Sequence, residues 1–132
     1  MMFREVLLCV LLGVSVAYPK YQQSIPNGQS VPNPCPGGTG NWKGVGHYNP
    51  YGGGDRNLFG LDFASSGHVW THDLCMDDSD SDGVSNGVEL GDPNCTWLPG
   101  QTPQGRATGH PGICEPMSDQ KCHTVNLNAI CV

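Results

Sequence analysis

Six cysteines follow the first seventeen residues of this chain, and they constrain its fold more than any other feature of the sequence. Residues 1–17 have the pattern of a secretory signal, with Arg4 near the start, an apolar run from Val6 to Val16, and a small-x-small cleavage site that ends at Ala17. Cys9 is removed with this segment. An even number of cysteines in an oxidising compartment predicts three disulfides. The six cysteines are Cys35, Cys75, Cys95, Cys114, Cys122 and Cys131.

Six cysteines allow fifteen pairings in principle. Cys75 and Cys95 flank a strongly acidic segment, so we expect a bridge that closes a ring around it and stabilises the fold by about 3 kcal/mol. For the other four cysteines we expect one local and one long-range bridge. These are Cys122–Cys131 and Cys35–Cys114.

The acidic segment has the spacing of a twelve-residue calcium-binding loop. In such a loop oxygen ligands stand at positions 1, 3, 5, 7, 9 and 12, and a glycine at position 6 makes a sharp turn. Gly83 falls at position 6, and a count that starts at Asp77 or Asp80 puts serines at required positions. The predicted metal ligands are Asp78, Asp80, Asp82, the carbonyl of Val84, Asn86 (directly or through a water) and, at the bidentate position, Glu89.

The distribution of charge also indicates a bound cation. Seven of the twelve acidic residues lie between Asp73 and Asp92, whereas no lysine or arginine occurs between Arg56 and Arg106. Unit charges about 4 Å apart repel by about 4 kcal/mol at an effective dielectric constant of about 20. We therefore expect Ca²⁺ as the cofactor. Extracellular calcium modules bind with dissociation constants of about 10⁻⁴ to 10⁻³ M, so the ion would stay bound outside the cell and act as structure.

Few apolar residues are available for a core. Residues 18–132 contain only 18 Leu, Ile, Val and Phe, fewer than the roughly one-fifth expected of a chain that folds. Disulfides, three tryptophans and a metal compensate, as in other small exported domains. We expect a single domain over 18–132, with a small, disulfide-rich, loop-dominated fold, a few short helices, and a single EF-hand-like calcium loop within the region 73–95.

Local patterns predict the course of the chain. Five prolines favour an extended, polyproline-like arm with turns over residues 18–36, and Asn27-Gly28 marks one of those turns. A helix is expected over Leu58–Ser66, because Asn57 can cap its start and Gly67 can end it.

Shorter elements follow. A short helix is expected within residues 68–75, where Val69 and Trp70 also favour a strand. One or two helical turns should extend from Asn86 to Gly91. The tail from Cys114 is expected to form a small bridged hairpin.

Charge and hydropathy exclude two classes of partner. The net charge of −6 and the lack of a basic cluster argue against nucleic acid and against anionic membranes. The apolar run at residues 6–16 is too short to span a bilayer, and no second run follows. We therefore expect a secreted, extracellular protein without membrane insertion.

Several segments of residues 18–132 are specific in combination. They are Tyr18-Pro-Lys-Tyr21, Ile25-Pro-Asn-Gly28, Trp42-Lys-Gly-Val-Gly-His47, Phe59-Gly-Leu-Asp-Phe-Ala64, Asp73-Leu-Cys75, and the acidic loop with Leu90-Gly-Asp-Pro93. Together they resemble the temptins, secreted water-borne protein pheromones of gastropod molluscs. The resemblance implies an attractant that acts with other secreted pheromone proteins and a receptor, and that has no catalytic chemistry. We therefore expect a protein that works by surface recognition and is not an enzyme.

Two residues of the loop depart from the usual pattern. Ser81 stands at position 4, where such loops usually have glycine, so the backbone there is expected to be strained. Ser85 stands at position 8, where paired loops have an aliphatic residue. The second departure favours an isolated structural loop over a paired calcium switch.

Two further kinds of site are predicted on the surface. Four aromatic residues are candidates for contact with partners, namely Trp42, Tyr48, Tyr51 and Trp97, whereas Trp70 is expected in the core. Asn94-Cys95-Thr96 is a formal N-glycosylation sequon, so Asn94 is a candidate for modification.

Two alternatives to a pheromone remain open from the sequence. The first is an extracellular-matrix or adhesion module in which the calcium loop supports binding to fixed partners. The second is a histidine-based, copper-dependent auxiliary or oxidase module, with His47 and His72 as the pair best suited to a metal. None of the five histidines has a recognised ligand spacing.

Overall fold

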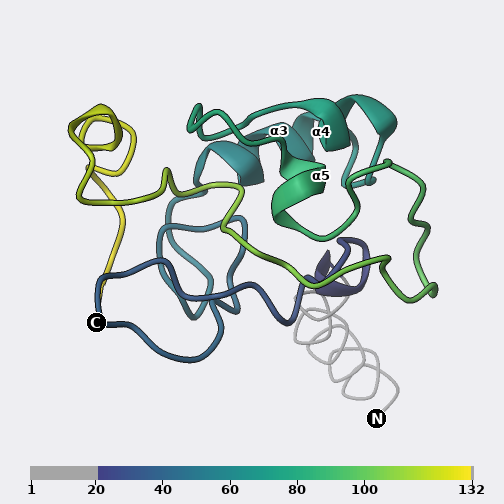
Figure 1. The fold of residues 1–132 in the computed structure, drawn as a ribbon, viewed down its shortest axis with the longest axis horizontal. Helices are drawn as coiled ribbons and strands as arrows, with labels where there is room; N and C mark the ends of the chain where they lie inside the picture. Colours follow the sequence, from purple (N-terminus) through teal and green to yellow (C-terminus); the bar gives the residue numbers. More distant parts are fainter. Residues whose placement is uncertain (1–20, 132) are drawn as a thin grey trace, which may run out of the picture.

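The computed structural model describes residues 21–131. Three short α-helices lie together at one end of the molecule, and loops make up most of the rest (Figure 1). The helices are α3 (Leu58–Ser65), α4 (His72–Met76) and α5 (Asn86–Glu89), and a 3₁₀ helix, η1 (Gln120–Cys122), follows near the C-terminus. Within residues 21–131 the β pairing consists of two isolated bridges, so there is no sheet. The expected small, disulfide-rich domain with a few short helices is confirmed.

The predicted signal, residues 1–17, lies outside the described residues. Among the described helices, none is long and apolar enough to cross a bilayer.

Helix α3 begins and ends where the local pattern predicts. Oδ1 of Asn57 accepts a hydrogen bond from the backbone N–H of Gly60 at 2.9 Å, which caps the first turn. Gly67 follows the helix with φ at +71°, a conformation that glycine adopts without strain. The Asn57 amide also donates to the carbonyls of Val45 and His47, at 2.8 and 3.0 Å. One buried side chain therefore joins the start of α3 to the preceding loop.

The segment after α3 becomes helical later than expected within residues 68–75. His68 has a left-handed backbone, with φ at +58°, and α4 starts only at His72. Oγ1 of Thr71 accepts the N–H of Leu74 at 3.1 Å and caps the helix. Between the two helices the Trp70 side chain enters the core, where 8% of the residue stays exposed, as expected.

The N-terminal part of the described chain folds back on the domain. Residues 21–23 are helical, so the expected extended arm over 18–36 is wrong there, whereas residues 24–29 form turns that include the one expected at Asn27-Gly28. The arm's first three residues, 18–20, lie outside the described residues. Ile25 and Val31 are buried in the core. Removing these two side chains from water stabilises the compact path over an extended one.

The core consists of two clusters of buried side chains. The larger one surrounds α3 and α4 and contains Ile25, Val31, Val45, Phe59, Phe63, Trp70, Leu74, Cys75, Leu90 and Trp97. The smaller one joins Cys35, Trp42 and Ile113, with Met117 and Ala129 packed against it. The modest number of apolar residues is therefore divided between the helices and the part of the molecule where Cys35 is bridged to Cys131.

Three disulfides connect the six cysteines, as the even count predicts. The expected Cys75–Cys95 bridge is present and spans 20 residues. The other two expected pairings, Cys122–Cys131 and Cys35–Cys114, are wrong. The structure instead joins Cys35 to Cys131, across 96 residues, and Cys114 to Cys122, across 8 residues. In the chain-entropy account the longest of these loops contributes most, about 4.7 kcal/mol.

Tertiary hydrogen bonds explain the observed pairing. The Asn126 side chain accepts from the N–H of Cys114 at 3.0 Å and donates to its carbonyl at 2.8 Å. This clamp folds the tail back through turns and η1, not through the hairpin we expected. Farther on, the N–H of Ile130 donates to the carbonyl of Tyr48 at 3.0 Å, and Cys131 lies next to Cys35.

Candidate metal centre

The predicted calcium loop connects helices α4 and α5, which pack against each other. Ser85 caps α5, since its Oγ accepts the N–H of Val88 at 3.3 Å. The Cys75–Cys95 bridge holds α4 to the segment that follows α5. Both ends of the loop are therefore fixed by the fold.

The loop turns so that its aspartates converge. The N–H of Gly83 donates to Oδ2 of Asp78 at 2.8 Å, and φ of Gly83 is +94°. Oδ1 of Asp82 accepts the N–H of Val84 at 3.0 Å. One carboxylate oxygen from each of Asp78, Asp80 and Asp82 lies within 4.8 Å of the other two. Converging carboxylate oxygens are the ligands that Ca²⁺ takes in proteins.

Glu89 reaches the same region from α5. Glu89 is 3% exposed, and Asp80 is fully buried. Oδ1 of Asp78, Oδ2 of Asp80 and Oε2 of Glu89 are buried and have no hydrogen-bond partner. A buried polar group without a partner costs about 1–3 kcal/mol, and more when it is charged. A cation among these oxygens would remove that cost.

The acids of the loop shift one another's protonation. Burial, and next the charge of Asp82, raise the pKa of Asp80 to about 9. Burial, and next the charge of Asp80, raise the pKa of Glu89 to about 11. Both carboxyls would bind protons at neutral pH unless a cation takes their place. No lysine or arginine stands between Arg56 and Arg106 to do so.

Glu115 is a fifth acid at this site, and the sequence analysis missed it. Its N–H donates to Oδ2 of Asp82 at 3.4 Å, and its charge contributes to the raised pKa of Glu89. Burial raises the pKa of Glu115 itself. Its Oε1 accepts the N–H of His110. Because Glu115 follows the loop by 26 residues (115 − 89), no motif spacing points to it.

The Asn86 side chain, expected as a ligand at position 9, is held by hydrogen bonds within the fold, and its ligation of a cation stays a prediction. Its Nδ2 donates to the carbonyl of Leu74 and to Oγ of Ser79, both at 2.8 Å, and its Oδ1 accepts the N–H of Ser79 at 3.3 Å. Oγ of Ser79 in turn donates to Asp62 of α3 at 2.7 Å. The Asn86 side chain thus fixes the loop to the helices. Ligation by the carbonyl of Val84 stays a prediction.

The strain expected at Ser81 is visible in the backbone. Its φ is +59°, in the left-handed region that glycine adopts at little cost. For residues other than glycine, this backbone conformation costs roughly 1–2 kcal/mol.

Just beyond the loop lies another buried acid, Asp92, which is 1% exposed. Its carboxylate accepts Nε1–H of Trp70 at 2.9 Å, the N–H of Thr96 at 3.0 Å, and the N–H of Trp97 at 3.2 Å. Three protein donors surround this carboxylate, so it needs no cation. It connects two tryptophans of the core beside the Cys75–Cys95 bridge.

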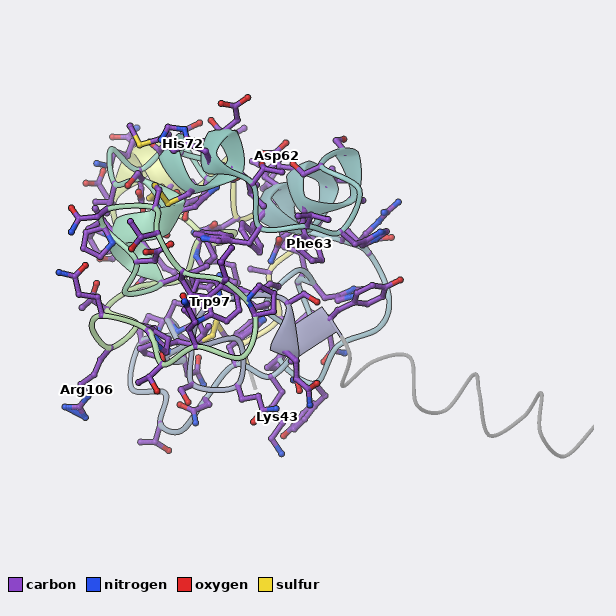
Figure 2. All side chains as sticks on the ribbon, turned by 90° about the vertical axis from the view of Figure 1, so that its right-hand side faces the viewer. Lys43, Asp62, Phe63, His72, Trp97 and Arg106 are labelled. Carbon is purple, nitrogen blue, oxygen red and sulfur yellow. A yellow bond between two sulfur atoms is a disulfide. The ribbon has the colours of Figure 1, made fainter. Side chains whose placement is uncertain are left out.

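The candidate partner residues divide into buried and exposed. Trp42 is fully buried and Trp97 is 7% exposed, so the expectation that they contact partners is wrong for both. Their size makes burial in a small core more favourable than exposure. Tyr48 is half-buried, and Tyr51, 78% exposed, remains available. In Figure 2 the labelled Arg106 extends away from the body of the molecule.

The other predicted sites lie on the surface or apart from one another. Asn94 is exposed and its Nδ2 donates to Gln104 at 3.0 Å, and its glycosylation stays a prediction. Within residues 21–131, one group of three potential metal-ligating side chains comes together. It consists of the three loop aspartates and includes no histidine. His72 is exposed beside Asp73, at 4.0 Å, and His47 lines a cavity.

Comparison with known proteins gives two matches. The family model described as Temptin C-terminal matches residues 15–113. Temptin of Aplysia californica is 56% identical over 111 residues, which cover 83% of this chain and 85% of that protein. No solved structure matches.

Proposed function

This chain belongs to the temptin family, and on that premise we propose that it is a secreted, calcium-binding, pheromone-like protein that acts by binding other proteins and catalyses no reaction. The three disulfides fit an extracellular location, because such bonds form and persist in oxidising compartments. The partners of this proposal are other secreted pheromone proteins and a receptor.

The three buried carboxylate oxygens without a hydrogen-bond partner carry the calcium part of the proposal. Asp78, Asp80, Asp82 and Glu89 would hold the ion, with Glu115 adding negative charge beside them. A hard cation that prefers oxygen and accepts irregular coordination fits this set of donors. Zinc and copper sites in proteins are instead dominated by nitrogen and sulfur.

Calcium would act here as a structural element. The ion would neutralise the loop between α4 and α5, and the Cys75–Cys95 bridge closes the same segment covalently. At the calcium concentrations found outside cells the site would stay filled. Recognition would then use a surface of fixed shape, with the exposed Tyr51 as a candidate contact.

Calorimetric titration of the oxidised, metal-free protein tests calcium binding. We expect one Ca²⁺ per chain, with a dissociation constant of about 10⁻⁴ to 10⁻³ M and much weaker Mg²⁺ binding. The double variant Asp80→Asn with Glu89→Gln should lose this binding. Asp73→Asn is the matched control, because the Asp73 side chain lies in the same segment and is fully exposed. Absence of calcium binding to the parent protein would contradict the proposal.

A pull-down from the fluid into which the protein is secreted tests recognition. We expect other secreted proteins to be retained in calcium and to be lost in chelator, since the ion fixes the shape of the loop region. If the double variant retains the same partners as the parent protein, partner binding does not depend on calcium.

A further inference from the structure

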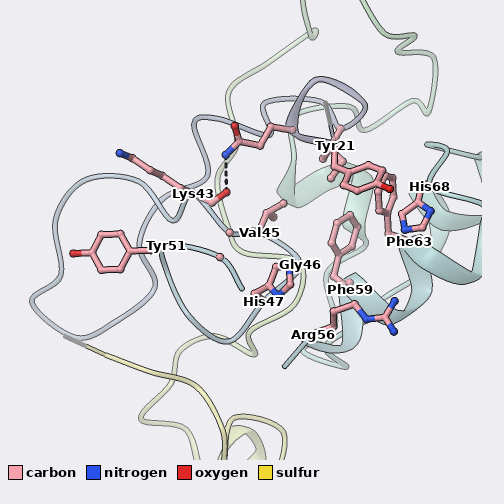
Figure 3. A pocket seen from close by; sticks show the side chains of 15 residues that line it. Tyr21, Lys43, Val45, Gly46, His47, Tyr51, Arg56, Phe59, Phe63 and His68 are labelled. Atoms are coloured by element: carbon pink, nitrogen blue, oxygen red, sulfur yellow. Dashed lines mark hydrogen bonds between the residues drawn. The ribbon is translucent and has the colours of Figure 1, made fainter. Parts of the chain in front are cut away.

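A cavity of about 490 Å³ is lined by Phe59, Gly60 and Phe63 of α3 and includes neither the calcium loop nor Asp62, to which that loop is tied. It is enclosed by the N-terminal turn, the loop 43–47 and α3 (Figure 3). Its volume is within the range of about 300–1,000 Å³ that small-molecule sites have.

Apolar and aromatic side chains form the inner surface of the cavity. Ile25, Val45, Phe59 and Phe63 are each 5% exposed or less, so they present a dry floor. Tyr21 stacks on His68 with ring centroids 4.6 Å apart and meets the edge of Phe63 at 6.2 Å. Such a surface suits the hydrocarbon or aromatic body of a ligand.

The walls of the cavity are held by backbone contacts. A Cβ on Gly60 would overlap the carbonyl oxygen of Gly46, so the loop packs directly on α3 because residue 60 is glycine. Nδ2 of Asn57 fastens the same loop through two carbonyls. Across the opening, Nε2–H of Gln22 donates to the carbonyl of Lys43 at 2.8 Å (Figure 3). The cavity is therefore formed before any ligand arrives.

The charges at the cavity are opposite in sign to the rest of the molecule. None of the described residues that line it is acidic, although the chain has twelve acids and a net charge of −6. Two of the four lysines and arginines in residues 21–131, Lys43 and Arg56, do line it. Neither forms an ion pair with any described acid. Figure 3 shows Lys43 on one side of the cavity and Arg56 on the other, near His68.

We propose that this cavity binds a small amphipathic carboxylate, with its apolar body against Tyr21 and Phe63 and its carboxylate near Lys43 or Arg56. Charge complementarity favours an anionic head over a neutral or cationic one, because both unpaired cations lie beside a low-dielectric surface. The protein would then carry a small molecule in addition to its own recognition surface. This proposal does not depend on calcium, since the loop carboxylates are not part of the cavity.

The test compares three nine-carbon probes with different heads: nonanoate, nonanol and nonylamine. Each is titrated into the oxidised, calcium-loaded protein and followed by amide chemical shifts. We expect nonanoate to bind about tenfold more tightly than nonanol, with nonylamine weakest, and the shifts to occur at residues 44–47 and 56–63. No binding up to several millimolar, or equal affinity for the three heads, would overturn the proposal.

Two charge variants and a control locate the head group. At least one of the variants Lys43→Gln and Arg56→Gln should weaken nonanoate binding about three- to fivefold and leave nonanol binding unchanged. Both side chains are exposed, so the substitutions leave the core intact. Lys121→Gln is the control, an exposed lysine outside the cavity. Unchanged nonanoate affinity in both variants would contradict the proposed site.

The chain's own residues 18–20 are the competing occupant, because they directly precede Tyr21. If contacts from these residues to Phe59 and Phe63 appear in nuclear Overhauser spectra and no probe binds, the cavity belongs to the N-terminal segment and the proposal is overturned.

Discussion

Two buried acidic sites lie within a few residues of each other and solve the same problem in different ways. Asp92 is surrounded by protein donors from Trp70, Thr96 and Trp97. Asp80 and Glu89 are equally buried, yet each keeps an oxygen without a partner, among other acids. A buried carboxylate is stable where the fold supplies hydrogen bonds, and elsewhere it requires a proton or a cation. The comparison therefore separates a site completed by the protein from one that needs an ion.

Removal of the satisfied carboxylate should have the largest effect. Asp92→Ala leaves three donors unpaired, two of them buried, and we expect a loss of about 4 kcal/mol in the free energy of unfolding. The loss should be the same in calcium and in chelator, because no ion is involved at Asp92. Denaturant titration in both conditions measures it. A loss below about 1 kcal/mol, or one confined to calcium, would show that the two sites are not distinct.

Removal of calcium should have the next largest effect. At a calcium concentration one hundred times the dissociation constant, binding stabilises the folded state by about 2.7 kcal/mol. Thermal unfolding with and without chelator measures this gain. The gain should persist in Asp92→Ala if enough of that variant stays folded, and should vanish in Asp80→Asn with Glu89→Gln. An equal gain in the double variant would mean that calcium acts elsewhere.

The metal-free loop should also make stability depend on pH. Burial raises the pKa of Asp80 and of Glu89 above their ordinary values in the fold, to about 9 and about 11. The stabilisation from their protonation is complete below about pH 4 and is lost as the pH rises toward the folded values. In chelator we therefore expect the free energy of unfolding to decrease steadily as the pH rises from 5 to 8.

Calcium should flatten this dependence, because the ion replaces the protons on the same oxygens. The measurement is the free energy of unfolding across that pH range, with and without calcium. Asp80→Asn with Glu89→Gln is the comparison, because the pH dependence should be lost when these two carboxyls are absent. Stability that is independent of pH in chelator would contradict the raised pKa values.

The smallest effect concerns the backbone of the loop. Ser81→Gly relieves the left-handed conformation at φ +59° and should stabilise the fold by up to about 1 kcal/mol. Because the strain is in the backbone, the gain should be similar in calcium and in chelator. Ser65→Gly, at an exposed helical position of α3, is the matched control and should destabilise by about 0.5–1 kcal/mol. A destabilised Ser81→Gly protein would show that the serine side chain has another role.

Local chemistry explains which features the sequence predicts well. The cap of α3 at Asn57, its end before Gly67, and the helical turn after Ser85 each depend on hydrogen bonds within about four residues. The convergence of the loop aspartates has the same origin, since Gly83 and the backbone N–H groups of the loop turn them inward. These elements are predictable because the chain specifies them over a few peptide units.

Non-local contacts explain what the sequence analysis missed. Trp42, Trp97 and Tyr51 are all aromatic, so residue type alone does not separate them. The path of the whole chain buries the two tryptophans and leaves Tyr51 exposed. Glu115 joins the acidic site from a segment that no motif connects with it. The position of Asn86 in the loop predicts a ligand. The hydrogen bonds of its side chain depend instead on where the fold places Leu74 and Ser79.

The sequence by itself determined the charge, the number of disulfides, the short helices, and the acidic loop, because counts and local hydrogen bonds do not depend on distant residues. Only the tertiary structure decided that Cys35 pairs with Cys131, that Asp92 is satisfied while Asp80 is not, and that a cationic cavity forms beside α3. The physical reason is that each of these requires segments far apart in the chain to meet. Packing of the few available apolar side chains sets where they meet.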